Sequence, residues 1–593
     1  MDLIIKARDG PARICEIHIN QNTVITPNIL FLKTSRFKIP ESADILLTSK
    51  NKNTKKTPIK LKNIYKKDIR DIVSIEMPNS KYFNNSSNIV YSDKNIQKIN
   101  KKENILFIIG NSLNISKKQT EFVNLIVKLR EKIGYKNLIY LPTIVDLSNL
   151  SLFTYMGIDL FDSTSAIITA RKNNLFFSSG NQNINEMRQI PCSCTYCKNY
   201  RDNPLSMPFE KILKHNYELL LNEIKCIRNH IFNGSLRDLI EIRSKTNVNS
   251  TALLRILDDK HYNYIEEKTP IIKKKKLIVT TKEALNRVEI KRFQERIIDR
   301  YKKPDSSKIL LLLPCSAKKP YSFSKSHKKF REKIFNLENP HIIHEIIITS
   351  PMGIVPRELE LIYPASNYDI PVTGLWDEEE KKIILTLLKN YLIKNKYDKI
   401  ILHLPKNIRE FISVIVSNPI NTEVVGNITS KESLNSLYNV LKEVSKNYPR
   451  VNFEKRKIEN IESILSYQFN KNLAKILVED CKIKGRYPYQ KIFNKNFQLG
   501  MLTKERGFIS LTTYGAKRIF NSNRYCIEIF DDFLLKGSLF APGIKKADKD
   551  IRIGDEVLII RNEKLCGVGV AQLNGIDMME LNYGEAVKVR HKV

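Results

Sequence analysis

Short apolar runs alternate with stretches of helical periodicity over most of the chain. Residues 309–313 form an apolar run that stops at Pro314, residues 346–348 form a second run, and residues 105–109 form a third. Short runs bounded by proline or glycine predict buried strands. Residues 119–133 carry apolar positions at helical spacing and are followed by a glycine, which favours a helix end there. The pattern predicts α/β domains built on buried strands.

The C-terminal stretch, residues 521–593, follows an all-β pattern. Residues 587–590 alternate valine with a basic residue, which predicts a half-buried strand with Lys588 and Arg590 on its outer face. The preceding residues 451–520 predict a small α+β module in which aromatic and basic side chains are interleaved. Such side chains can stack bases and hold phosphates, although they also make ordinary amphipathic surfaces. Lys588 and Arg590 are therefore candidate RNA contacts.

The end of the run at residues 309–313 is rich in reactive side chains. Cys315 comes directly after Pro314, and these side chains follow it: Ser316, Lys318, Lys319, Tyr321, Ser324, Ser326 and His327. Open α/β sheets place ligands at such strand ends, and cationic neighbours lower the pKa of a thiol and make it a nucleophile. We interpret Cys315 as a candidate nucleophile with Lys318 and His327 as catalytic partners. The alternative is a basic turn in which Cys315 only fills space.

A second polar stretch, residues 349–376, follows the run at residues 346–348. It holds these candidate binding groups among prolines and glycines: Arg357, Glu358, Glu360, Tyr368 and Asp369. Prolines stiffen loops, and binding groups tend to lie on loops held by a scaffold. Because the two stretches are close in sequence, we expect one shared site. The alternative is an ordinary surface loop.

Three clustered cysteines and a histidine give the strongest local signal. Cys192, Cys194 and Cys197 have the spacing C-x-C-x-x-C, and His215 follows on a predicted helix at residues 209–231. Zn²⁺ takes thiolate and imidazole ligands in a tetrahedral site, and a Cys₃His shell leaves no open position. The spacing predicts a structural zinc site, with unligated cysteines as the alternative. An iron–sulfur cluster is disfavoured because the radical-SAM spacing C-x₃-C-x₂-C is absent.

Length and charge limit the class of protein. The 593 residues suffice for about three to five domains at roughly 100–200 residues each. The formal net charge of +36 suits a polyanion such as nucleic acid, although a composition rich in Lys, Ile and Asn contributes to it. The basic tract at residues 49–70 is either a solvated insertion or an arm that binds a nucleic-acid backbone. Nine cysteines are too few for a disulfide scaffold, and no apolar run approaches the ~18 residues of a membrane span. We therefore expect a soluble, cytoplasmic protein with no membrane partner.

Two motifs carry a family resemblance. The stretches PCSAKKPYSFSKSH, from residue 314, and SPMGIVPRELE, from residue 350, resemble the signatures of the archaeal archaeosine synthases. Residues 5–13 and 157–180 resemble queuine tRNA-ribosyltransferases, also called tRNA-guanine transglycosylases, and residues 521–593 resemble a PUA domain. By the transglycosylase resemblance, Asp162 takes the place of the aspartate nucleophile, and the cysteine–histidine order matches that family's zinc site.

The resemblance implies a multidomain α/β protein. The implied parts are a TIM-barrel-like transglycosylase-related domain with the zinc site (residues 1–265), a linker (266–307), a central α/β catalytic domain (308–450), a small α+β linking module (451–520) and a β-barrel PUA domain that binds RNA (521–593). The catalytic transglycosylases also carry a glycine-rich base pocket that we do not find between residues 26 and 104. We therefore expect Asp162 to be a relic, since a fold does not imply a function. From the residues alone, a carboxylate after a strand either attacks an anomeric carbon or caps the strand end.

The resemblance also implies a substrate, which is tRNA carrying 7-cyano-7-deazaguanine in its D-arm. The enzyme would add an amine donor, free lysine or nitrogen from glutamine, to the nitrile, and a radical-SAM partner would complete archaeosine. The Cys315 thiolate would give a thioimide that the amine converts to an amidine. Protons would be moved by Lys318, Lys319 or His327, and the cationic donor would be held by Glu358, Glu360 or Asp369.

Three alternatives remain open at this point. The motif that begins at Pro314 could only cradle phosphate or base while the amine attacks directly. Asp162 could exchange guanine for the modified base, as in the transglycosylases. The chain could also be a non-catalytic scaffold that presents tRNA to another enzyme.

Overall fold

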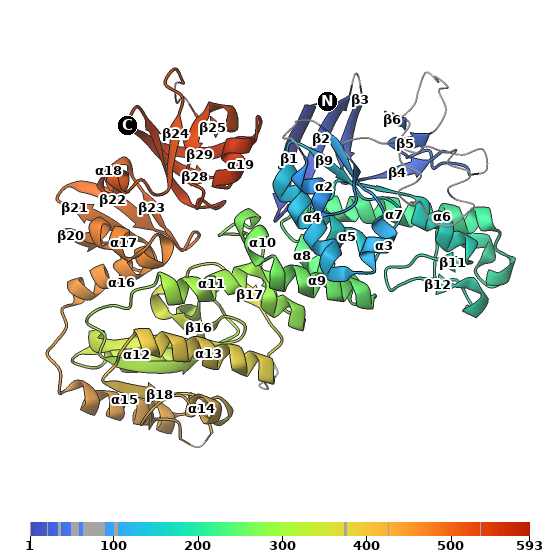
Figure 1. Cartoon of the computed structure of the whole chain (residues 1–593). Coiled ribbons are helices and arrows are strands. Elements are labelled where there is room, and N and C mark those ends of the chain that lie inside the picture. Colours follow the sequence, from blue (N-terminus) through green and yellow to red (C-terminus); the bar gives the residue numbers. More distant parts are fainter. Residues whose placement is uncertain are drawn as a thin grey trace. The chain divides into compact units, whose positions relative to one another are not determined.

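The computed structural model describes residues 2–19, 22–33, 37–48, 59–62, 89–99, 105–372, 376–424, 426–533, 535 and 537–593. The chain divides into two compact units (Figure 1). Unit 1 comprises Met1–Thr269, Phe540–Pro542 and Ile576–Gly584, and unit 2 comprises Pro270–Leu539, Gly543–Gly575 and Glu585–Val593. Most of the basic tract at residues 49–70 lies outside the described residues.

The main sheet of unit 1 is parallel and has the strand order β6-β5-β4-β10-β9-β8-β7. Its strands are β4 (Asn28–Leu32), β5 (Ile45–Thr48), β6 (Ile59–Lys62), β7 (Ile89–Val90), β8 (Leu106–Ile109), β9 (Leu138–Tyr140) and β10 (Leu160–Asp162). The last of these strands, β10, pairs with the first, β4, as in a parallel barrel. Closure of the barrel depends on what lies between β6 and β7, where residues 63–88 are outside the described part, so the TIM barrel stays a prediction.

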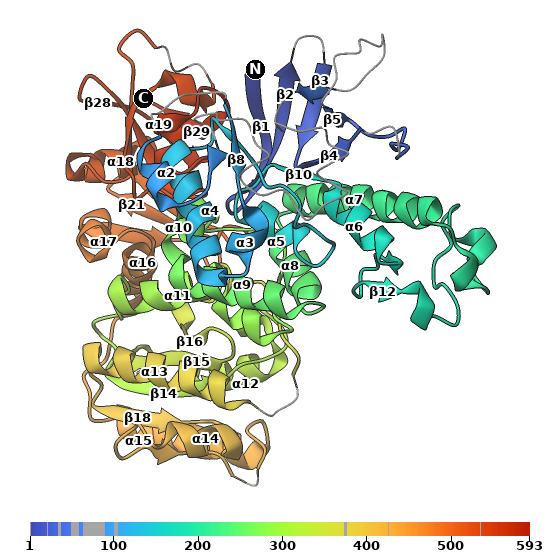
Figure 2. The same cartoon turned by 45° about the vertical axis from the view of Figure 1, so that its right-hand side comes forward.

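Helices and a small antiparallel sheet complete unit 1. The antiparallel strands are β1 (Asp2–Asp9), β2 (Ala12–Ile19) and β3 (Asn22–Thr26), and two short strands, β11 (Asn174–Leu175) and β12 (Gln182–Asn183), pair with each other. The helices are α2 (Asp93–Gln97), α3 (Ser112–Ser116), α4 (Gln119–Ile133), α5 (Leu150–Tyr155), α6 (Thr164–Arg171), α7 (Phe209–Phe232), α8 (Leu236–Ser244), α9 (Val248–Lys260) and α10 (Tyr262–Lys268). Figure 2 shows α7 alongside α6. The helix predicted at residues 119–133 is confirmed as α4.

Residues 230–258 are mainly helical and comprise the end of α7, then α8 and α9. Gly234 lies directly after α7 with a φ of +65°, a conformation that glycine adopts without strain. A glycine in this conformation ends α7 and turns the chain into α8.

The central sheet of unit 2 has the strand order β16-β15-β14-β18-β19. Its strands are β14 (Ile309–Pro314), β15 (Ile343–Thr349), β16 (Gly353–Pro356), β18 (Lys399–Leu402) and β19 (Ile420–Asn421), of which only β16 runs antiparallel to its neighbour. The chain leaves β14 through α12 (Lys325–Phe335) to β15 on one side, and reaches β18 on the other side through α13 (Glu378–Lys394). The carboxyl ends of β14 and β18 therefore form the topological switch point of this sheet.

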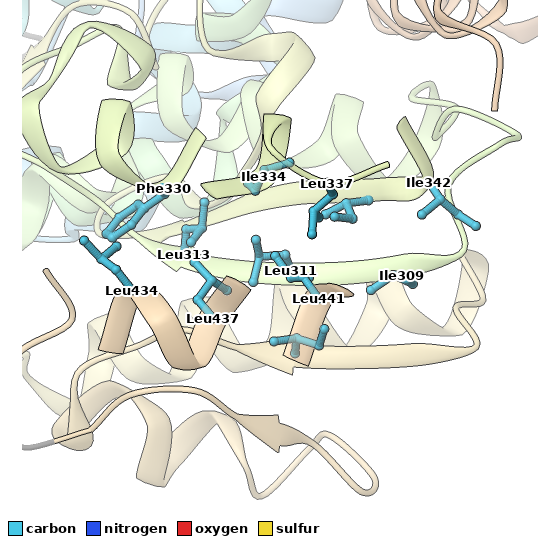
Figure 3. Close-up of a cluster of buried hydrophobic side chains, with 12 residues drawn as sticks. Ile309, Leu311, Leu313, Phe330, Ile334, Leu337, Ile342, Leu434, Leu437 and Leu441 are labelled. Atoms are coloured by element: carbon cyan, nitrogen blue, oxygen red, sulfur yellow. The ribbon is translucent and has the colours of Figure 1, made fainter. Parts of the chain in front are cut away.

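A hydrophobic core lies on one face of β14 (Figure 3). Ile309, Leu311 and Leu313 alternate along the strand and point toward α12 and α15 (Lys431–Ser445). Phe330 and Ile334 meet them from α12. All six residues of β14 are buried, as expected of a parallel strand covered on both faces. The strand predicted at residues 309–313 is confirmed.

The rest of unit 2 comprises a small module and a C-terminal sheet. The module contains α16 (Phe453–Gln468), α17 (Lys471–Val478), β20 (Cys481–Lys484), β21 (Gln490–Asn494), β22 (Phe497–Leu502), β23 (Ile509–Leu511) and α18 (Thr513–Ile519). The C-terminal sheet has the order β25-β29-β28-β27-β24-β26. Its strands are β24 (Cys526–Ile529), β25 (Leu539–Phe540), β26 (Ile544–Ala547), β27 (Glu556–Arg561), β28 (Lys564–Ala571) and β29 (Glu585–Lys592). Helix α19 (Gly575–Glu580) precedes β29 in sequence, but all of it except Gly575 belongs to unit 1.

The stretch expected as a linker, residues 266–307, contains regular structure. It holds β13 (Leu277–Ile278), which pairs with β17 (Tyr368–Asp369), and α11 (Val288–Asp299), which contacts α13. The remaining helix of the unit is α14 (Lys406–Ile412). No helix in the described part of the chain is long and apolar enough to span a membrane.

Candidate functional site

Cys315 lies at the carboxyl end of β14, at the topological switch point of the central sheet. Its side chain lines a pocket of about 480 Å³ together with Ser350, which follows β15, and Pro405, which follows β18. Trp376 and Ile408 also line the pocket. A concave, mostly apolar pocket at a switch point is where α/β sheets bind ligands. The thiol is therefore in reach of a bound molecule.

A chain of hydroxyl groups lies beside the thiol. The Thr349 hydroxyl hydrogen-bonds to Cys315 and shares a 2.6 Å hydrogen bond with the Tyr368 hydroxyl. Tyr368 in turn shares a 2.9 Å hydrogen bond with Tyr321. The Lys319 ammonium lies 3.9 Å from the centroid of the Tyr368 ring. Thr349 and Lys319 thus act directly on the thiol, and the two tyrosines extend the chain of hydroxyl groups from Thr349.

The electrostatics at Cys315 differ from the sequence expectation. Burial raises the pKa of the Cys315 thiol, and the Thr349 hydrogen bond and the charge of Lys319 offset only part of that rise. Burial also lowers the pKa of Lys319. Lys319 therefore lowers the thiol pKa as expected, but the net shift has the opposite sign because desolvation is larger. The resting pair is a protonated thiol beside an ammonium that gives up its proton more readily than a free lysine.

His327 does not face the pocket as a proton carrier. It is fully buried, its Nε2 donates to the Pro314 carbonyl at 2.9 Å, and its Nδ1 accepts from Arg357 Nη2 at 2.8 Å. Burial, with the charge of Arg357 next, lowers the pKa of His327 to about 2. The geometry contradicts the predicted proton shuttle, because both ring nitrogens are occupied and the ring stays neutral. His327 instead holds the residue that precedes Cys315.

Arg357 connects the two sequence motifs. Its guanidinium pairs with Glu345 on β15 at 2.6 Å and with Glu360 at 2.9 Å, besides its bond to His327. These carboxylates raise the pKa of Arg357 although burial opposes them. Glu360 also accepts from the backbone N–H of Ser322 at 2.9 Å. The predicted closeness of the two motifs is confirmed at this cluster.

Glu358 and Glu360 do not line the Cys315 pocket. Glu358 accepts from Tyr301 at 3.2 Å and Arg456 at 3.3 Å, and contacts His344. Burial alone would raise the pKa of Glu358, but His344 and Arg456 outweigh it and hold the pKa at about 2. Both glutamates line a second pocket of about 1030 Å³. Their protein partners and their location contradict the idea that they hold the donor beside Cys315.

The remaining motif residues have local roles. Ser316 donates to the Lys318 carbonyl at 2.9 Å, and the Lys318 side chain is exposed. Ser324 caps α12 by accepting from the backbone N–H of His327, and it shares a hydrogen bond with Ser326. Asp369 is exposed and pairs with Lys276 at 3.3 Å. These contacts do not place Ser324 or Ser326 in the pocket.

The cysteine cluster is assembled for a tetrahedral metal. One ligand atom from each of Cys192, Cys194, Cys197 and His215 lies within 4.8 Å of the others. The His215 Nε2–H donates to the Phe176 carbonyl at 2.9 Å, so the Nδ1 lone pair faces the three sulfur atoms at 3.3 to 3.7 Å. A histidine ligand is usually fixed in this way by a hydrogen bond to its second nitrogen. The donor set fits a closed metal site.

Asp162 is fully buried inside unit 1. Its side chain is 0% exposed and accepts from the Tyr140 hydroxyl at 2.5 Å and from the backbone N–H groups of Thr143 at 3.1 Å and Thr164 at 2.8 Å. Burial raises the pKa of Asp162, while these hydrogen bonds oppose that rise. Both carboxylate oxygens are occupied by protein donors, an arrangement typical of a strand-end cap.

The two candidate RNA contacts of β29 differ. Lys588 is exposed. Arg590 instead pairs with the buried Glu556 of β27, which also holds Arg506 at 3.0 Å. Burial, with the charge of Arg506 next, lowers the pKa of Arg590 to about 10. The pairing contradicts an RNA contact by Arg590, whereas Lys588 remains available.

Sequence reasoning missed several residues of the two pockets. Trp376 and Pro405 line the Cys315 pocket, and Arg456 and Tyr487 line the larger one. Thr349 bonds to the thiol from the strand before the second motif. Position at or just after a strand end is a usable signal for Thr349 and Pro405. Trp376 is the chain's single tryptophan, a rarity that could have drawn attention to it.

Family models match three parts of the chain. Residues 86–248 match the queuine tRNA-ribosyltransferase model, residues 290–441 match a domain of unknown function (DUF5591), and residues 531–593 match the PUA domain model. The chain is 28% identical over 462 residues to a tRNA-guanine(15) transglycosylase of Methanobrevibacter smithii, covering 74% of this chain and 64% of that one. The chain is a multidomain α/β transferase acting on tRNA, with a transglycosylase-like domain and a C-terminal PUA domain.

Two further relatives show to which family of tRNA-modifying transferases the chain belongs. An archaeosine synthase subunit alpha of Methanosarcina acetivorans is 37% identical over 502 residues, which are 82% of this chain and 79% of that one. An archaeosine synthase of Haloferax volcanii is 29% identical over 605 residues, 99% of this chain and 98% of that one. The chain belongs to the archaeosine synthase family and has a role in archaeosine modification of tRNA.

Proposed function

We propose that the protein adds an amine to the nitrile of 7-cyano-7-deazaguanine in the D-arm of tRNA. The observation that carries this proposal is the position of Cys315 in a pocket at the switch point, with Lys319 beside it. A nitrile carbon is electrophilic, and a thiol beside a lysine whose pKa is lowered is a nucleophile suited to it, because that lysine can exchange protons during the reaction.

The proposed reaction has two steps. The Cys315 sulfur forms a bond to the nitrile carbon while the thiol proton passes to the nitrile nitrogen, giving a thioimide. The donor amine then attacks the same carbon, the C–S bond breaks, and the thiol is restored with a proton from the amine, leaving an amidine. We assign the proton transfers to Lys319, because its pKa is lowered and it is next to the thiol.

Free lysine is the proposed donor, and a radical-SAM protein is the proposed partner. Both follow from the family resemblance, which also leaves glutamine-derived nitrogen as an alternative donor. Several relatives are named archaeosine synthase subunit alpha, which supports a second subunit. Asp369 is the proposed holder of the cationic donor, because its carboxylate is exposed, pairs with Lys276 at the surface and is not buried against protein donors.

The transglycosylase-like domain is proposed as a tRNA-binding platform. We propose that it is a TIM barrel closed between β6 and β7, that it carries a structural Zn²⁺ on the Cys₃His cluster, and that Asp162 is a relic of base exchange. The proposed domain boundaries are residues 1–265, 266–307, 308–450, 451–520 and 521–593. The first and last domains would hold tRNA, and the central domain would carry out the chemistry.

Mass spectrometry of tRNA tests the proposal. Nitrile-bearing tRNA is incubated with the protein and with lysine, glutamine or no amine. A new adduct of the mass of lysine supports the synthase. Exchange of labelled guanine would support base exchange through Asp162 instead, and binding without either product would indicate a scaffold.

A further inference from the structure

The larger pocket of unit 2 is built from two parts of the chain. Its volume is about 1030 Å³. One wall comes from α12, from the 3₁₀ helix η7 (Pro340–Ile342) and from the 3₁₀ helix η8 (Arg357–Leu359). The other comes from the start of α16 and the turn between β20 and β21. Cys315 is not among its lining residues, so this pocket is distinct from the one that holds the thiol.

The charged side chains at the floor of this pocket form ion pairs with one another. Arg357 pairs with Glu360, and Arg456 pairs with Glu358. The Tyr487 hydroxyl also donates to Glu360 at 2.7 Å. These buried groups are satisfied by one another. The exposed Glu338 also lines the pocket, but its single carboxylate is outnumbered by the arginines of the rim.

The rim of the pocket is cationic. The guanidinium groups of Arg450 and Arg486 have no hydrogen bond or ion pair to any residue that the structure describes, and both side chains are exposed. Arg486 is presented by a turn that requires Gly485, whose φ is +93° and where a Cβ would meet the Tyr489 carbonyl oxygen at 2.5 Å. Two unpaired guanidiniums at one opening favour a ligand with phosphate or carboxylate groups.

An aromatic strip runs along the same opening. The rings of Phe335 and His341 are 6.3 Å apart, and those of His341 and Phe453 are 5.2 Å apart with an interplanar angle of 30°. Phe335 is 49% exposed and Phe453 is 52% exposed. Cations of the protein lie over two of these rings, Arg331 over Phe335 at 5.1 Å and Lys457 over Phe453 at 4.3 Å. Partly exposed aromatic rings beside cations are the combination with which proteins stack bases and hold the backbone of single-stranded nucleic acid.

We propose that this pocket binds an unpaired nucleotide of the RNA substrate. Its base stacks on the strip formed by Phe335, His341 and Phe453, and its phosphates meet Arg450 and Arg486. The volume admits a nucleotide, and the cationic rim fits a polyanion better than an amino acid, whose ammonium group it repels. The proposal rests on tRNA being the substrate of the proposed function.

Salt dependence of tRNA binding tests the phosphate contacts. Arg450→Gln/Arg486→Gln should lower the slope of log affinity against log salt by about 1.4, because each lost contact to a single strand accounts for roughly 0.7. The matched control is Lys446→Gln/Lys455→Gln, which removes the same charge from two exposed residues that line neither pocket. An equal loss of slope in the control would overturn the proposal.

Phe453→Ala tests the stacking. Phe453 is the exposed first residue of α16, so the variant should fold, and its affinity for tRNA should drop roughly 5- to 150-fold at fixed salt. Ultraviolet crosslinking of the wild-type complex should attach a nucleotide to the peptide that contains His341 or Phe453. Unchanged affinity in Phe453→Ala, or crosslinks only elsewhere, would overturn the proposal.

The measurements use unmodified tRNA transcript and no amine, so they do not depend on the chemistry at Cys315. A failed proposed function would appear as intact tRNA binding without an adduct, and it would leave this test valid. If the Arg450→Gln/Arg486→Gln protein keeps its tRNA affinity and slope but loses calorimetric binding of free lysine, the pocket is a donor site and the nucleotide is excluded.

Discussion

Asp162 and Cys315 occupy equivalent places at the ends of parallel strands in two sheets but have opposite surroundings. Each lies at the carboxyl end of a strand, Asp162 at the end of β10 and Cys315 directly after β14. Asp162 is fully buried with both oxygens occupied by protein donors, whereas Cys315 lines a pocket of about 480 Å³. A strand end supplies a position for chemistry, but access to it depends on what the following loops do.

The difference lies in the residues that meet each strand end. Asp162 is closed off by Tyr140 at the end of β9, by Thr143 in the loop that follows, and by Thr164 at the start of α6. At Cys315 the connections that follow β14 and β18 lead to opposite sides of the sheet. The pocket between them stays open, and Ser350 and Pro405, which follow the neighbouring strands, line it. The comparison predicts that the protein's chemistry is carried by the central domain and not by the transglycosylase-like one.

Among the variants that test this comparison, Cys315→Ser is expected to have the largest effect on activity. A hydroxyl stays protonated near neutral pH, so we expect at least a ~10³-fold loss of amine transfer with tRNA affinity unchanged. Adduct formation is measured by mass spectrometry and binding by filter retention. Nitrile-bearing tRNA without amine should also trap a thioimide at Cys315 in the wild type. Wild-type turnover by Cys315→Ser would reassign the motif to a binding cradle.

Cys194→Ser should destabilise the transglycosylase-like domain, in which Asp162 is buried. The cluster holds His215 on α7, and the same helix carries Tyr217, which hydrogen-bonds to Ser163 next to Asp162. Structural zinc supplies about 10–16 kcal/mol of apparent binding energy in small peptides, so we expect loss of bound zinc and a clear drop in melting temperature. Cys226→Ser, also on α7 but outside the cluster, is the matched control. Purified wild-type protein without zinc by elemental analysis would contradict the site.

Acid should weaken the central domain because its buried histidines are neutral. The pKa of His327 is lowered to about 2 and that of His403 to about 4, mainly by burial. A depressed histidine pKa contributes stability that is present above about pH 6.5 and is lost as the pH falls. Between pH 7.5 and 5.5 each histidine should cost about 1.4 kcal/mol of unfolding free energy.

Urea unfolding followed by the fluorescence of Trp376, the single tryptophan, measures this loss in the central domain. His327→Gln should remove about 1.4 kcal/mol of the loss between pH 7.5 and 5.5, the share of one histidine, even if it lowers the overall stability. An unchanged pH dependence would show that His327 is protonated in the folded protein and could act on protons after all.

Lys588→Gln and Arg590→Gln should distinguish an exposed lysine that can contact RNA from an arginine that pairs with a buried glutamate in the PUA domain. Lys588→Gln should reduce the log–log salt slope of tRNA binding by roughly 0.7–0.9, the effect of one phosphate contact. Arg590→Gln should leave the slope unchanged and cost about 1–3 kcal/mol of stability, because it removes a partner of buried Glu556. The reverse pattern would restore Arg590 as the RNA contact.

Asp162→Asn should have the smallest effect on activity. Asparagine keeps the size of the side chain, and we expect amine transfer within about twofold of wild type, with a stability loss of about 1–2 kcal/mol from imperfect pairing with the three donors. Activity and thermal unfolding are compared on the same preparation. Complete loss of transfer by a folded variant would move the chemistry to unit 1.

Features set by local spacing in the sequence were predicted better than features that depend on tertiary contacts. The cysteine cluster, helix α4 and strand β14 follow from spacing and periodicity within a few residues of sequence. The sign of the thiol pKa shift at Cys315 did not follow, because burial depends on loops that the sequence does not place. Arg590 on β29 pairs with Glu556 on β27, and alternation along one strand cannot reveal a partner on another.

The bond between Arg357 and His327 has a consequence for protein engineering. His327 holds the Pro314 carbonyl, and Arg357 holds His327, so the backbone before the thiol is fixed by a residue of the other motif. A loop grafted into another scaffold with the first motif alone would lack that support. The smallest transplantable unit is therefore both motifs together with the strand that carries Glu345.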